Sequence, residues 1–406
     1  MMDYLLNDEI RQWRKKAADF AKGELKPRAA EWDRRAGIDP ATAFPFDALK
    51  KCSKAGLRTV TVPKEMGGAG LGILGHCVLL EELFLGEAGF ASVVHQGWKL
   101  AKMLCHFTSD AQRKEFLPRF MNVDTSTMAI GMTEPDHGTD NILPARQPEA
   151  GLKLSARRNG SGGWILNGMK HFIACAAMSN INFLLTRTDA SVPVNEGCTM
   201  FILTDELRGF RRGRVHGKLG ARLLMNAEMI YENCEVPDAW RLSEVNKGVP
   251  FMARVFSRHS PTTATFAVGI ARAAYEEALA YAGKRVQCGV PIIQHEGVRN
   301  RLADMYTSVS VARDAIWHAA WHADTAPEGQ YDPKEGLRVA LFASEMAPEV
   351  CISAMNVFGG NGYMWDHPAE RHVRDALMCY HIDGLNDITR MKLGAMLAGE
   401  AHAGAI

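Results

Sequence analysis

The sequence predicts a multidomain α+β protein in which a β domain separates two helical regions. Apolar residues recur at helical spacing from about residue 4 to 121 and again from about 249 to 402. Between them, from roughly 126 to 237, the pattern shortens to strands bounded by Gly, Asn and Asp. We therefore divide the chain into an N-terminal helical domain (1–124), a middle β domain (125–240) and a C-terminal helical bundle (241–406).

The N-terminal region has the periodicity of amphipathic helices. The stretch "DEIRQWRKKAADFAKGEL" (8–25) repeats apolar residues three and four positions apart. In "TSDAQRKEFLPRF" (108–120), Ser109 precedes Gln112 by three residues, which is the spacing of a capping box. A helix is therefore expected to begin just after Ser109.

The middle region contains five segments with strand character. They alternate or run apolar, and they are "TSTMAIGMTE" (125–134), "WILNGMKHFIAC" (164–175), "INFLLTRTD" (181–189), "CTMFILTD" (198–205) and "NAEMIYENCEVP" (226–237). Within the second segment, Asn167-Gly168 predicts a two-residue hairpin turn. Long helical patterns then return in "ATFAVGIARAAYEEALAYAGKR" (264–285) and "PKEGLRVALFASEMAPEVCISAMNVF" (333–358), enough for a bundle that could oligomerise.

Charge and composition exclude several classes of function. The 47 basic and 46 acidic side chains give a formal net charge of +1, so nothing indicates a nucleic acid or an anionic membrane as partner. The basic run "RGFRRGRVHGK" (208–218) is interpreted as a solvated strand edge or turn, with a phosphorylated ligand or a partner as the alternative. No run is long enough to span a membrane, so no membrane insertion is expected.

The termini and the cysteines indicate a reducing compartment. The first residues, "MMDYLLNDEIRQWRKK", are charged within three positions and have no apolar core, so no signal peptide is expected. The nine cysteines are scattered, odd in number and never spaced as C-x-x-C. We expect buried thiols in a cytoplasmic protein, without disulfides or zinc ligands.

Two motifs are rejected as functional sites. Gly70, Gly72 and Gly75 form a literal G-x-G-x-x-G, but no strand runs into it, so a loop between helices is favoured over a dinucleotide site. His318 and His322 lie one helical turn apart, but no acid or third ligand accompanies them. An aromatic-flanked helix face is favoured there, and no metal site is predicted.

Three separated stretches combine residues suited to binding a polar heterocycle. In "IGMTEPDHGTDN" (130–141) a strand ends in polar residues, and Gly138 permits a close backbone approach. The stretch "WILNGMKHFIACA" (164–176) delivers Phe172 and the small Ala174. The third, "FGGNGYMWDHPAERHVRDALMCYHIDGLNDITR" (358–390), is a glycine-rich helix junction that leads to Asp383.

These stretches resemble the acyl-CoA dehydrogenase family. Its motifs "TEPxAGSD", "NGxKxWITN" and "GGxGYxxExPxERxxRDAxxxxIYEGTxxIQR" match in the same order, and "KLGARLLMNAEMIYENCEVP" (218–237) resembles "KxGxRxSxTxxVxFxxVxVP". The similarity extends from about residue 5 to 398. It implies a helical domain, a β-barrel-like domain and a four-helix bundle, assembled as a homotetramer.

The resemblance also implies FAD between the β domain and the bundle. The residues it places at the flavin and pyrophosphate are Ile130, Met132, Thr133, Gly138 and Thr139, and those it places over the ring are Phe172, Ile173 and Ala174. Those expected to reach the FAD of the adjacent subunit are Arg285, Gln287, His295, Asn356 and Gly360, with Asn386 and Asp387 following the catalytic base. A guanidinium fork at Arg285 suits a diphosphate.

In this family the catalytic base is the glutamate of "YEG", and Ile382-Asp383-Gly384 stands in its place. Asp383 would take the proton α to the thioester while flavin N5 accepts hydride from the β-carbon. Its backbone N–H, with a ribityl hydroxyl of FAD, would polarise the thioester carbonyl. An apolar, closed site would raise the pKa of the carboxyl toward a useful range for a base.

Aspartate in place of glutamate bears on the substrate. The carboxylate is withdrawn by about 1.5 Å, and a misplacement of about 1 Å can cost ~100-fold in rate. A short, branched or cyclic acyl-CoA would bring its α-carbon closer. The alternative is an oxidase acting on a small carbon acid such as a nitroalkane, since nitroalkane oxidases resemble this family and use an aspartate here. A third possibility is that Asp383 is relaxed and the activity altered or lost.

Other departures from the family concern the remaining site residues. His259 stands where some members carry their base and is the second candidate for it, with a pocket wall or a helix start as the alternative. Arg258 is nearest to a family arginine that contacts CoA, and Thr139, Asp383 and Gly384 are also expected at the substrate. His95 and Trp98 would close the acyl pocket, although a core tryptophan explains Trp98 equally well.

The electron acceptor expected from the family is an electron-transfer flavoprotein. Another acceptor, or an enoyl-CoA reductase direction, would use the same site. From a different class, a DNA-associated relative would be expected to carry a strongly basic C-terminal region, whereas "RMKLGAMLAGEAHAGAI" (390–406) is nearly neutral.

Overall fold

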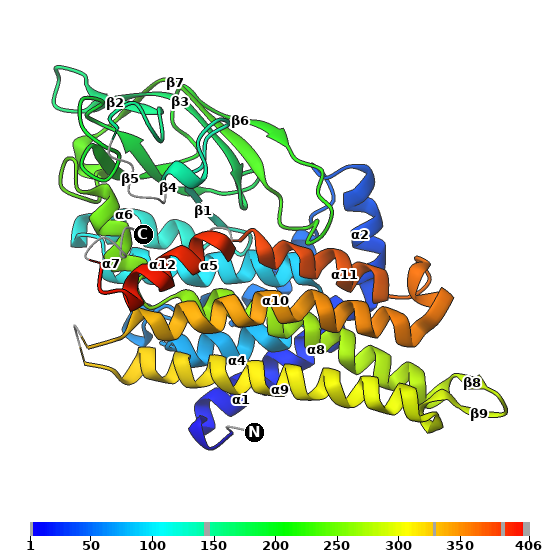
Figure 1. The fold of residues 1–406 in the computed structure, drawn as a ribbon. Coiled ribbons are helices and arrows are strands. Elements are labelled where there is room, and N and C mark those ends of the chain that lie inside the picture. The colour runs from blue at the N-terminus through cyan, green and yellow to red at the C-terminus, as the bar shows by residue number, and fades with distance from the viewer. Residues whose placement is uncertain (1–2, 142–146, 328–329, 383–385, 401–406) are drawn as a thin grey trace.

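The computed structural model describes residues 3–141, 147–327, 330–382 and 386–400. Helices, a curved sheet and then helices follow one another along the chain, and the sheet lies against one side of the helical body (Figure 1). The order expected from the hydrophobic periodicity is confirmed. No helix in these ranges is both long enough and apolar enough to cross a bilayer.

The N-terminal helices build the wall on which the rest of the chain packs. Their bounds are α1 Asp8–Phe20, α2 Ala29–Ile38, α3 Phe46–Lys54, α4 Ile73–Phe84, α5 Ala88–His106 and α6 Asp110–Met121. The capping box before α6 is confirmed, because Ser109 and Gln112 each bond the other's backbone N–H. Every residue of α4 is buried, which makes it a central helix of the fold.

Seven strands form one curved sheet. They are β1 Met128–Gly131, β2 Ser155–Arg158, β3 Trp164–Ile173, β4 Ile181–Arg187, β5 Cys198–Thr204, β6 Phe210–Val215 and β7 Ala227–Val236. Their order is β1-β4-β2-β3-β7-β6, with β5 paired to β4 and β1 parallel to β4. The basic run therefore forms an edge strand, β6, as predicted. All residues of β4 and β5 are buried, consistent with their continuous apolar sequence.

The hairpin turn predicted at Asn167-Gly168 is wrong. Strand β3 runs through both residues, and its register against β7 shifts between Leu166 and Gly168. Gly168 has φ 137°, and a Cβ there would lie 2.8 Å from Leu154 Cα. Glycine is needed at position 168 for a bulge and for the close approach of a neighbouring strand. The dipeptide Asn167-Gly168 alone does not distinguish these features from a turn.

The C-terminal region is a bundle of long helices. Its elements are α7 Gly248–Phe256, α8 Ser260–Lys284, β8 Val286–Gln287, β9 Val290–Pro291, α9 Glu296–Thr325, α10 Pro333–Phe358, α11 Ala369–Leu377 and α12 Asn386–Leu397. Helices α11 and α12 lie end to end beside α10 as the fourth member (Figure 1). Helix α4 packs on α8 at Gly269, where a Cβ would lie 2.6 Å from Phe84 Cβ.

The loop predicted between helices is confirmed at Gly70 and Gly72, whereas Gly75 lies inside α4. Gly72 precedes the helix, and the Asp324 carboxylate of α9 accepts hydrogen bonds from the N–H groups of Ile73 (2.6 Å) and Leu74 (2.8 Å). The position where a dinucleotide phosphate would lie is therefore filled by a side chain of the same protein. His318 and His322 lie on α9 beside Trp321 and Tyr331, which confirms the aromatic-flanked helix face.

A buried ion network joins the N-terminal helices to the bundle. Glu81 of α4 is fully buried and accepts hydrogen bonds from Arg272 of α8 (2.9 Å) and Arg313 of α9 (2.8 Å). Its neighbour Glu82 accepts from Arg14 of α1 (2.8 Å) and from Arg272 (3.0 Å). The nine cysteines form no disulfide, so such contacts, together with apolar packing, hold the elements in place.

Glu81→Gln is expected to lower the free energy of unfolding by about 3–5 kcal/mol, because the buried Arg313 loses the carboxylate with which it pairs and Arg272 loses one of its three carboxylate partners. Glu276→Gln is the matched control, since its side chain also pairs with Arg272 but is 44% exposed, and its effect should be about 1 kcal/mol or less. Urea and thermal unfolding measure both. Equal effects of the two variants would contradict a dominant role for the buried network.

Candidate active site

The ends of β1 and β3 lie side by side and bring two of the predicted segments together. The backbone N–H of His171 donates to the carbonyl of Thr133 at 2.8 Å. Ile130 and Met132 are half-buried at the end of β1 and pack against the core cluster beneath the sheet. Residues about 40 positions apart in sequence thus form one edge.

A buried ion pair fixes this edge. Lys170 is fully buried, and its Nζ donates to Glu134 Oε1 (2.9 Å) and to the carbonyl of Met132 (2.9 Å). The Glu134 carboxylate also accepts from the backbone N–H groups of Lys153 (2.6 Å) and Leu154 (2.9 Å). Burial lowers the pKa of Lys170, and the charge of Glu134 opposes that shift. One salt bridge therefore connects three separate segments.

Phe172 is presented to solvent by a strained backbone. It has φ 59° and is 57% exposed, while the following Ile173 is buried and Ala174 is partly buried. A positive φ is unusual for an aromatic residue and must be held by its surroundings. The amide of Asn226 supplies that support by donating to the Phe172 carbonyl at 2.8 Å.

Lys218 holds Asn226 in turn. Its Nζ donates to Asn226 Oδ1 (2.8 Å), to the carbonyl of Ala221 (2.8 Å) and to that of Leu224. Burial lowers the pKa of this lysine to about 7. Neither Lys218 nor Asn226 was singled out as a site residue. Both lie in the stretch 218–237 that resembles a family motif, but that resemblance does not predict a contact with Phe172.

Gly138 and Thr139 follow the end of β1. A Cβ added to Gly138 would meet nothing within 4 Å, so the backbone faces open space there. Thr139 begins a short 3₁₀ helix, Thr139–Asn141. Beside it, His137 Nδ1 lies 2.9 Å from Asp140 Oδ2, which also accepts from the Gly151 N–H at 2.9 Å.

The proposed base and its neighbour lie outside the described residues. Asp383 and Gly384 fall between Ile382 and the start of α12 at Asn386. Asn386 Oδ1 accepts from Ser344 Oγ of α10 at 2.9 Å, and its Nδ2 is buried without a hydrogen-bond partner among the described residues. Asp387 is exposed and pairs with Arg390 at 3.2 Å.

His259 stands at the start of α8, as one alternative expected. It is buried, and its ring lies 5.6 Å from that of Phe256 in a T-shaped arrangement. Arg258 donates to the carbonyls of Ala323 (2.7 Å), Ala326 (3.2 Å) and Pro327 (3.2 Å) at the C-terminal end of α9. Because the Arg258 guanidinium caps the end of α9 through these bonds, a contact between Arg258 and CoA is disfavoured.

His95 and Trp98 are both buried on α5, and both rings pack against His76. Trp98 Nε1 donates to the Leu57 carbonyl at 2.7 Å, so it packs within the N-terminal domain. The His95 ring lies 4.7 Å from Phe266 of α8, and its Nδ1 lies 3.0 Å from His76 Nε2. Burial and the adjacent His95 hold the pKa of His76 well below its usual range. His95 is therefore the residue that faces the bundle.

The remaining predicted residues lie at the far end of the bundle. Arg285, Gln287 and His295 belong to the β8–β9 hairpin region, which Figure 1 shows projecting beyond the sheet. His295 Nε2 lies 3.2 Å from the Gln287 carbonyl. Asn356 and Gly360 are exposed at the nearby end of α10. These five residues are separated from the β1–β3 edge within one copy of the chain.

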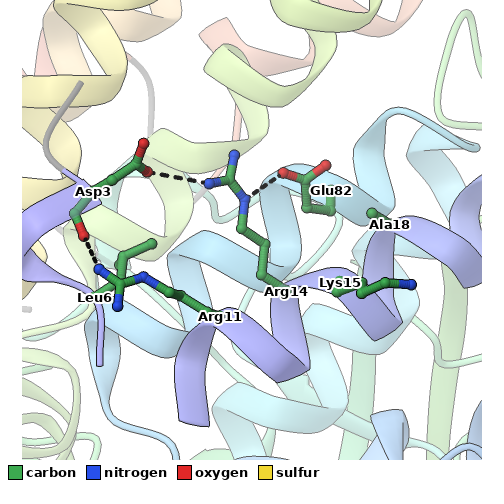
Figure 2. Close-up of a pocket in the computed structure, with 7 residues that line it drawn as sticks. All are labelled: Asp3, Leu6, Arg11, Arg14, Lys15, Ala18 and Glu82. Carbon is green, nitrogen blue, oxygen red and sulfur yellow. Dashed lines mark hydrogen bonds and ion pairs between the residues drawn. The ribbon is translucent and has the colours of Figure 1, made fainter. Parts of the chain in front are cut away.

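A surface hollow of about 380 Å³ beside α1 does not belong to this site (Figure 2). Most of its charged residues are engaged with one another, because Arg14 contacts Asp3 (3.3 Å) and Glu82 (2.8 Å) and Arg11 donates to the Asp3 carbonyl (2.9 Å). The hollow lies against the helices of the N-terminal domain, away from the strand ends.

Known sequences and structures match the whole chain. Residues 7–124, 129–234 and 246–398 match the N-terminal, middle and C-terminal domains of acyl-CoA dehydrogenase, respectively. The chain is 32% identical to an acyl-CoA dehydrogenase of Bacillus subtilis, over 95% of this chain and 97% of that one. It is 31% identical to the mitochondrial 2-methylacyl-CoA dehydrogenase of Solanum tuberosum, over 97% and 91%.

Two solved structures show the same fold. Butyryl-CoA dehydrogenase from Megasphaera elsdenii matches with a TM-score of 0.88 at 29% identity, over 97% of this chain and 99% of that chain. A chain from the structural work on the electron transferring flavoprotein of Acidaminococcus fermentans matches with a TM-score of 0.86 at 29% identity, over 97% and 98%. Sequence identity over nearly the full length and agreement in fold lead to the same conclusion: the chain belongs to the acyl-CoA dehydrogenase family.

Proposed function

We propose that this acyl-CoA dehydrogenase binds FAD at the β1–β3 edge and desaturates a short, branched or cyclic acyl-CoA. Support comes above all from the edge itself, where the ion pair of Lys170 and Glu134 fixes two family motifs and leaves Phe172 exposed. The runner-up, oxidation of a small carbon acid such as a nitroalkane, needs no CoA site and is an outcome of the test below.

The residues present fit a flavin. Phe172 offers an exposed aromatic face, and the backbone at Gly138 faces open space into which a phosphate could approach. Asn386 Nδ2, buried and without a partner among the described residues, could donate to the cofactor. We propose that Ile130, Met132, Thr133, Gly138, Thr139, Phe172, Ile173, Ala174, Asn386 and Asp387 hold FAD within one subunit.

FAD, when bound, accepts the hydride that leaves the β-carbon. The chain supplies the proton acceptor, for which we propose the carboxylate of Asp383, with His259 as the second candidate. The backbone N–H of Asp383 would donate to the thioester carbonyl and stabilise negative charge that develops on its oxygen. Thr139 and Gly384 are proposed to contact the substrate beside this residue.

The floor of the acyl site supports a compact substrate. His95, His76 and Phe266 fill the space between α4, α5 and α8 with buried rings. Two similar proteins are named for short or branched acyl groups, butyryl-CoA and 2-methylacyl-CoA. We propose a substrate of that class, with electrons passed to an electron-transfer flavoprotein.

A second copy of the chain would complete the site. Val286, Tyr363, Met364 and Trp365 are 51%, 76%, 51% and 72% exposed near the end of the bundle. Large apolar side chains exposed at one end of a bundle are candidates for burial in an interface between subunits. We propose a homotetramer in which Arg285, Gln287, His295, Asn356 and Gly360 reach the FAD of the adjacent subunit.

Asp383→Asn is expected to slow anaerobic bleaching of the flavin by an acyl-CoA about 10²–10⁴-fold, the usual contribution of a general base. Asp383→Glu should slow bleaching by a 2-methylacyl-CoA and speed bleaching by butyryl-CoA, because the carboxylate moves outward by about 1.5 Å. Absorbance near 450 nm follows each reaction, and Asp19→Asn on the exposed face of α1 is the control.

Each other outcome identifies a different error. Bleaching that survives in Asp383→Asn would move the base elsewhere, and His259→Gln would be measured next. Bleaching by a nitroalkane alone, with oxygen consumed and peroxide released, would favour the oxidase. A protein purified without flavin that does not take up FAD would overturn the cofactor assignment.

Lys170→Met is expected to reduce the FAD retained on purification, because Glu134 loses its partner and the ends of β1 and β3 are no longer fixed. The buried carboxylate left behind should also lower the free energy of unfolding by about 3–5 kcal/mol. The double variant Lys170→Met/Glu134→Leu tests the pair, since removing both charges should cost less than removing one. An additive double-mutant cycle would contradict the coupling.

Replacing Tyr363 and Trp365 together with serine is expected to convert the tetramer into smaller species and to lower the FAD content. Light scattering after size-exclusion chromatography measures the mass, and the absorbance ratio at 450 and 280 nm measures the flavin. Ile38→Ser is the matched control, because Ile38 is 87% exposed on α2, in another domain. An unchanged mass in the double variant would place the interface elsewhere.

A further inference from the structure

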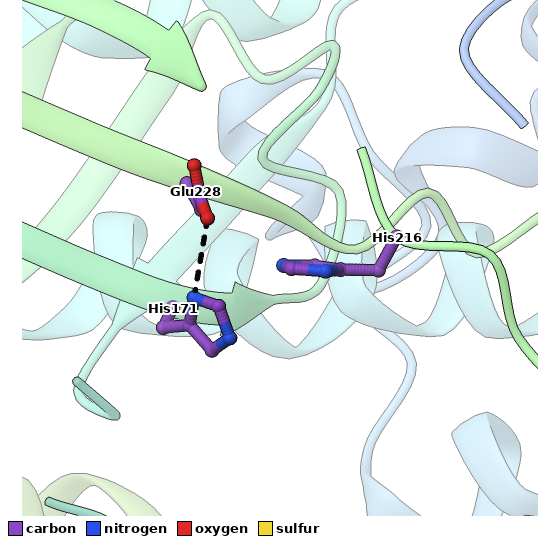
Figure 3. A group of neighbouring side chains, drawn as sticks. All are labelled: His171, His216 and Glu228. Atoms are coloured by element: carbon purple, nitrogen blue, oxygen red, sulfur yellow. Dashed lines mark ion pairs between the residues drawn. The ribbon is translucent and has the colours of Figure 1, made fainter. Parts of the chain in front are cut away.

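Three side chains with metal-binding atoms meet at the edge of the β domain (Figure 3). Strand pairing brings them together: Lys170 of β3 faces Met229 of β7, which places His171 near Glu228. Val215 of β6 faces Ala227 of β7, and the next residue, His216, donates its backbone N–H to Asn226 at 2.9 Å. His171 and His216 are 45 positions apart in sequence, and His216 and Glu228 are 12 apart, so no local motif predicts the group.

Their ligand atoms are close to one another, and both histidines carry a buried nitrogen without a hydrogen-bond partner in the part of the chain that the structure describes. One atom from each residue lies within 4.8 Å of the others, and the two imidazole centroids are 4.6 Å apart. His171 Nδ1 lies 3.5 Å from Glu228 Oε1, too far for a good hydrogen bond. His171 Nδ1 and His216 Nε2 are both buried and make no hydrogen bond among the described residues. Buried polar atoms without partners need an explanation, and a bound ion is one.

The charges around the group permit a cation. Glu228 Oε2 accepts from the backbone N–H of Arg214 at 2.9 Å, which orients the carboxylate and leaves Oε1 toward the imidazoles. The His216 ring is buried and packs against the His171 ring within the group. The cationic side chains of Arg214 and Lys218 act on the same ring and oppose a bound cation, while Glu228 favours it.

We propose that His171, His216 and Glu228 bind one divalent transition-metal ion, with Zn²⁺ as the first candidate. Two imidazoles and one carboxylate are a ligand set that zinc uses, with the fourth position open to water. Bonds of about 2.0–2.2 Å put tetrahedral ligand atoms roughly 3.4 Å apart. The separation of 3.5 Å between His171 and Glu228 is already near that value, and side-chain rotation would close the wider ones.

A bound ion would also fix the exposed aromatic residue next to it. The Phe172 ring lies 3.9 Å from the His171 ring and 4.8 Å from the His216 ring. Holding both imidazoles on one ion would restrict the position of that ring at the end of β3. The proposed metal site does not require the flavin assignment, because every ligand belongs to the β domain of one chain.

The full-length protein, as purified and after treatment with EDTA, tests the site. Calorimetric titration with Zn²⁺ should give one equivalent per chain, and Co²⁺ should give the visible bands of a tetrahedral complex. Removal of a direct ligand in His216→Ala or Glu228→Gln should weaken Zn²⁺ binding by more than ~100-fold, beyond the 10–100-fold typical of outer-shell changes. His318→Ala, which alters the exposed histidine on α9, should leave the affinity unchanged.

Thermal unfolding keeps the test valid if a variant is destabilised. Zn²⁺ should raise the Tm of the wild-type protein, because it binds only the folded state, and should not raise that of Glu228→Gln. Flavin content is recorded for every sample, so a failure of FAD binding is seen separately. Equal Zn²⁺ affinity in wild type, His216→Ala and Glu228→Gln, or loss of binding in His318→Ala, would show that the ion binds elsewhere and that the proposal is wrong.

Discussion

The buried pair of Lys170 and Glu134 is the contact on which the geometry of the candidate site depends. Lys170 donates to Glu134 and to the Met132 carbonyl, and Glu134 also accepts from the backbone N–H groups of Lys153 and Leu154. Such a pair is not retained for stability alone, because apolar replacements of similar volume often do as well. Its specific effect here is to set the ends of β1 and β3 against each other. The segments that we propose to face the flavin are thereby positioned by charge inside the sheet rather than by the packing of surface loops.

A second chain of polar contacts holds the conformation that this edge requires. Phe172 and Cys175 both have positive φ, which is a strained arrangement for residues other than glycine. Lys218 orients Asn226, and Asn226 holds the Phe172 carbonyl. The low pKa of the lysine, about 7, reflects the cost of burying its ammonium group among carbonyl oxygens. The strain at residue 172 is therefore supported from a loop some 45 residues further along the chain.

Periodicity predicted the order of the domains because burial of one helix face or one strand face is a local property of sequence. The capping box at Ser109 was also predictable, because it depends on hydrogen bonds between residues only three positions apart. Asn167-Gly168 was misread as a turn, since a bulge in a long strand uses the same residues and depends on the neighbouring strands. The partnership of Glu134 with Lys170, the support of Phe172 by Asn226 and the meeting of His171 with His216 are all set by strand register. Register is a tertiary property that spacing along one sequence does not encode.

Two features, at opposite ends of the proposed acyl site, both favour a compact substrate. If Asp383 is the base, its carboxylate is about 1.5 Å shorter in reach than a glutamate, so the α-carbon must come to it. At the other end, the buried rings of His76, His95 and Phe266 form the floor that we propose for the acyl site, which leaves no room for a longer chain. A long straight acyl chain would lose at both ends, because it could neither extend past the rings nor widen at the α-carbon. A branched or cyclic group is short and broad, and it satisfies both constraints at once.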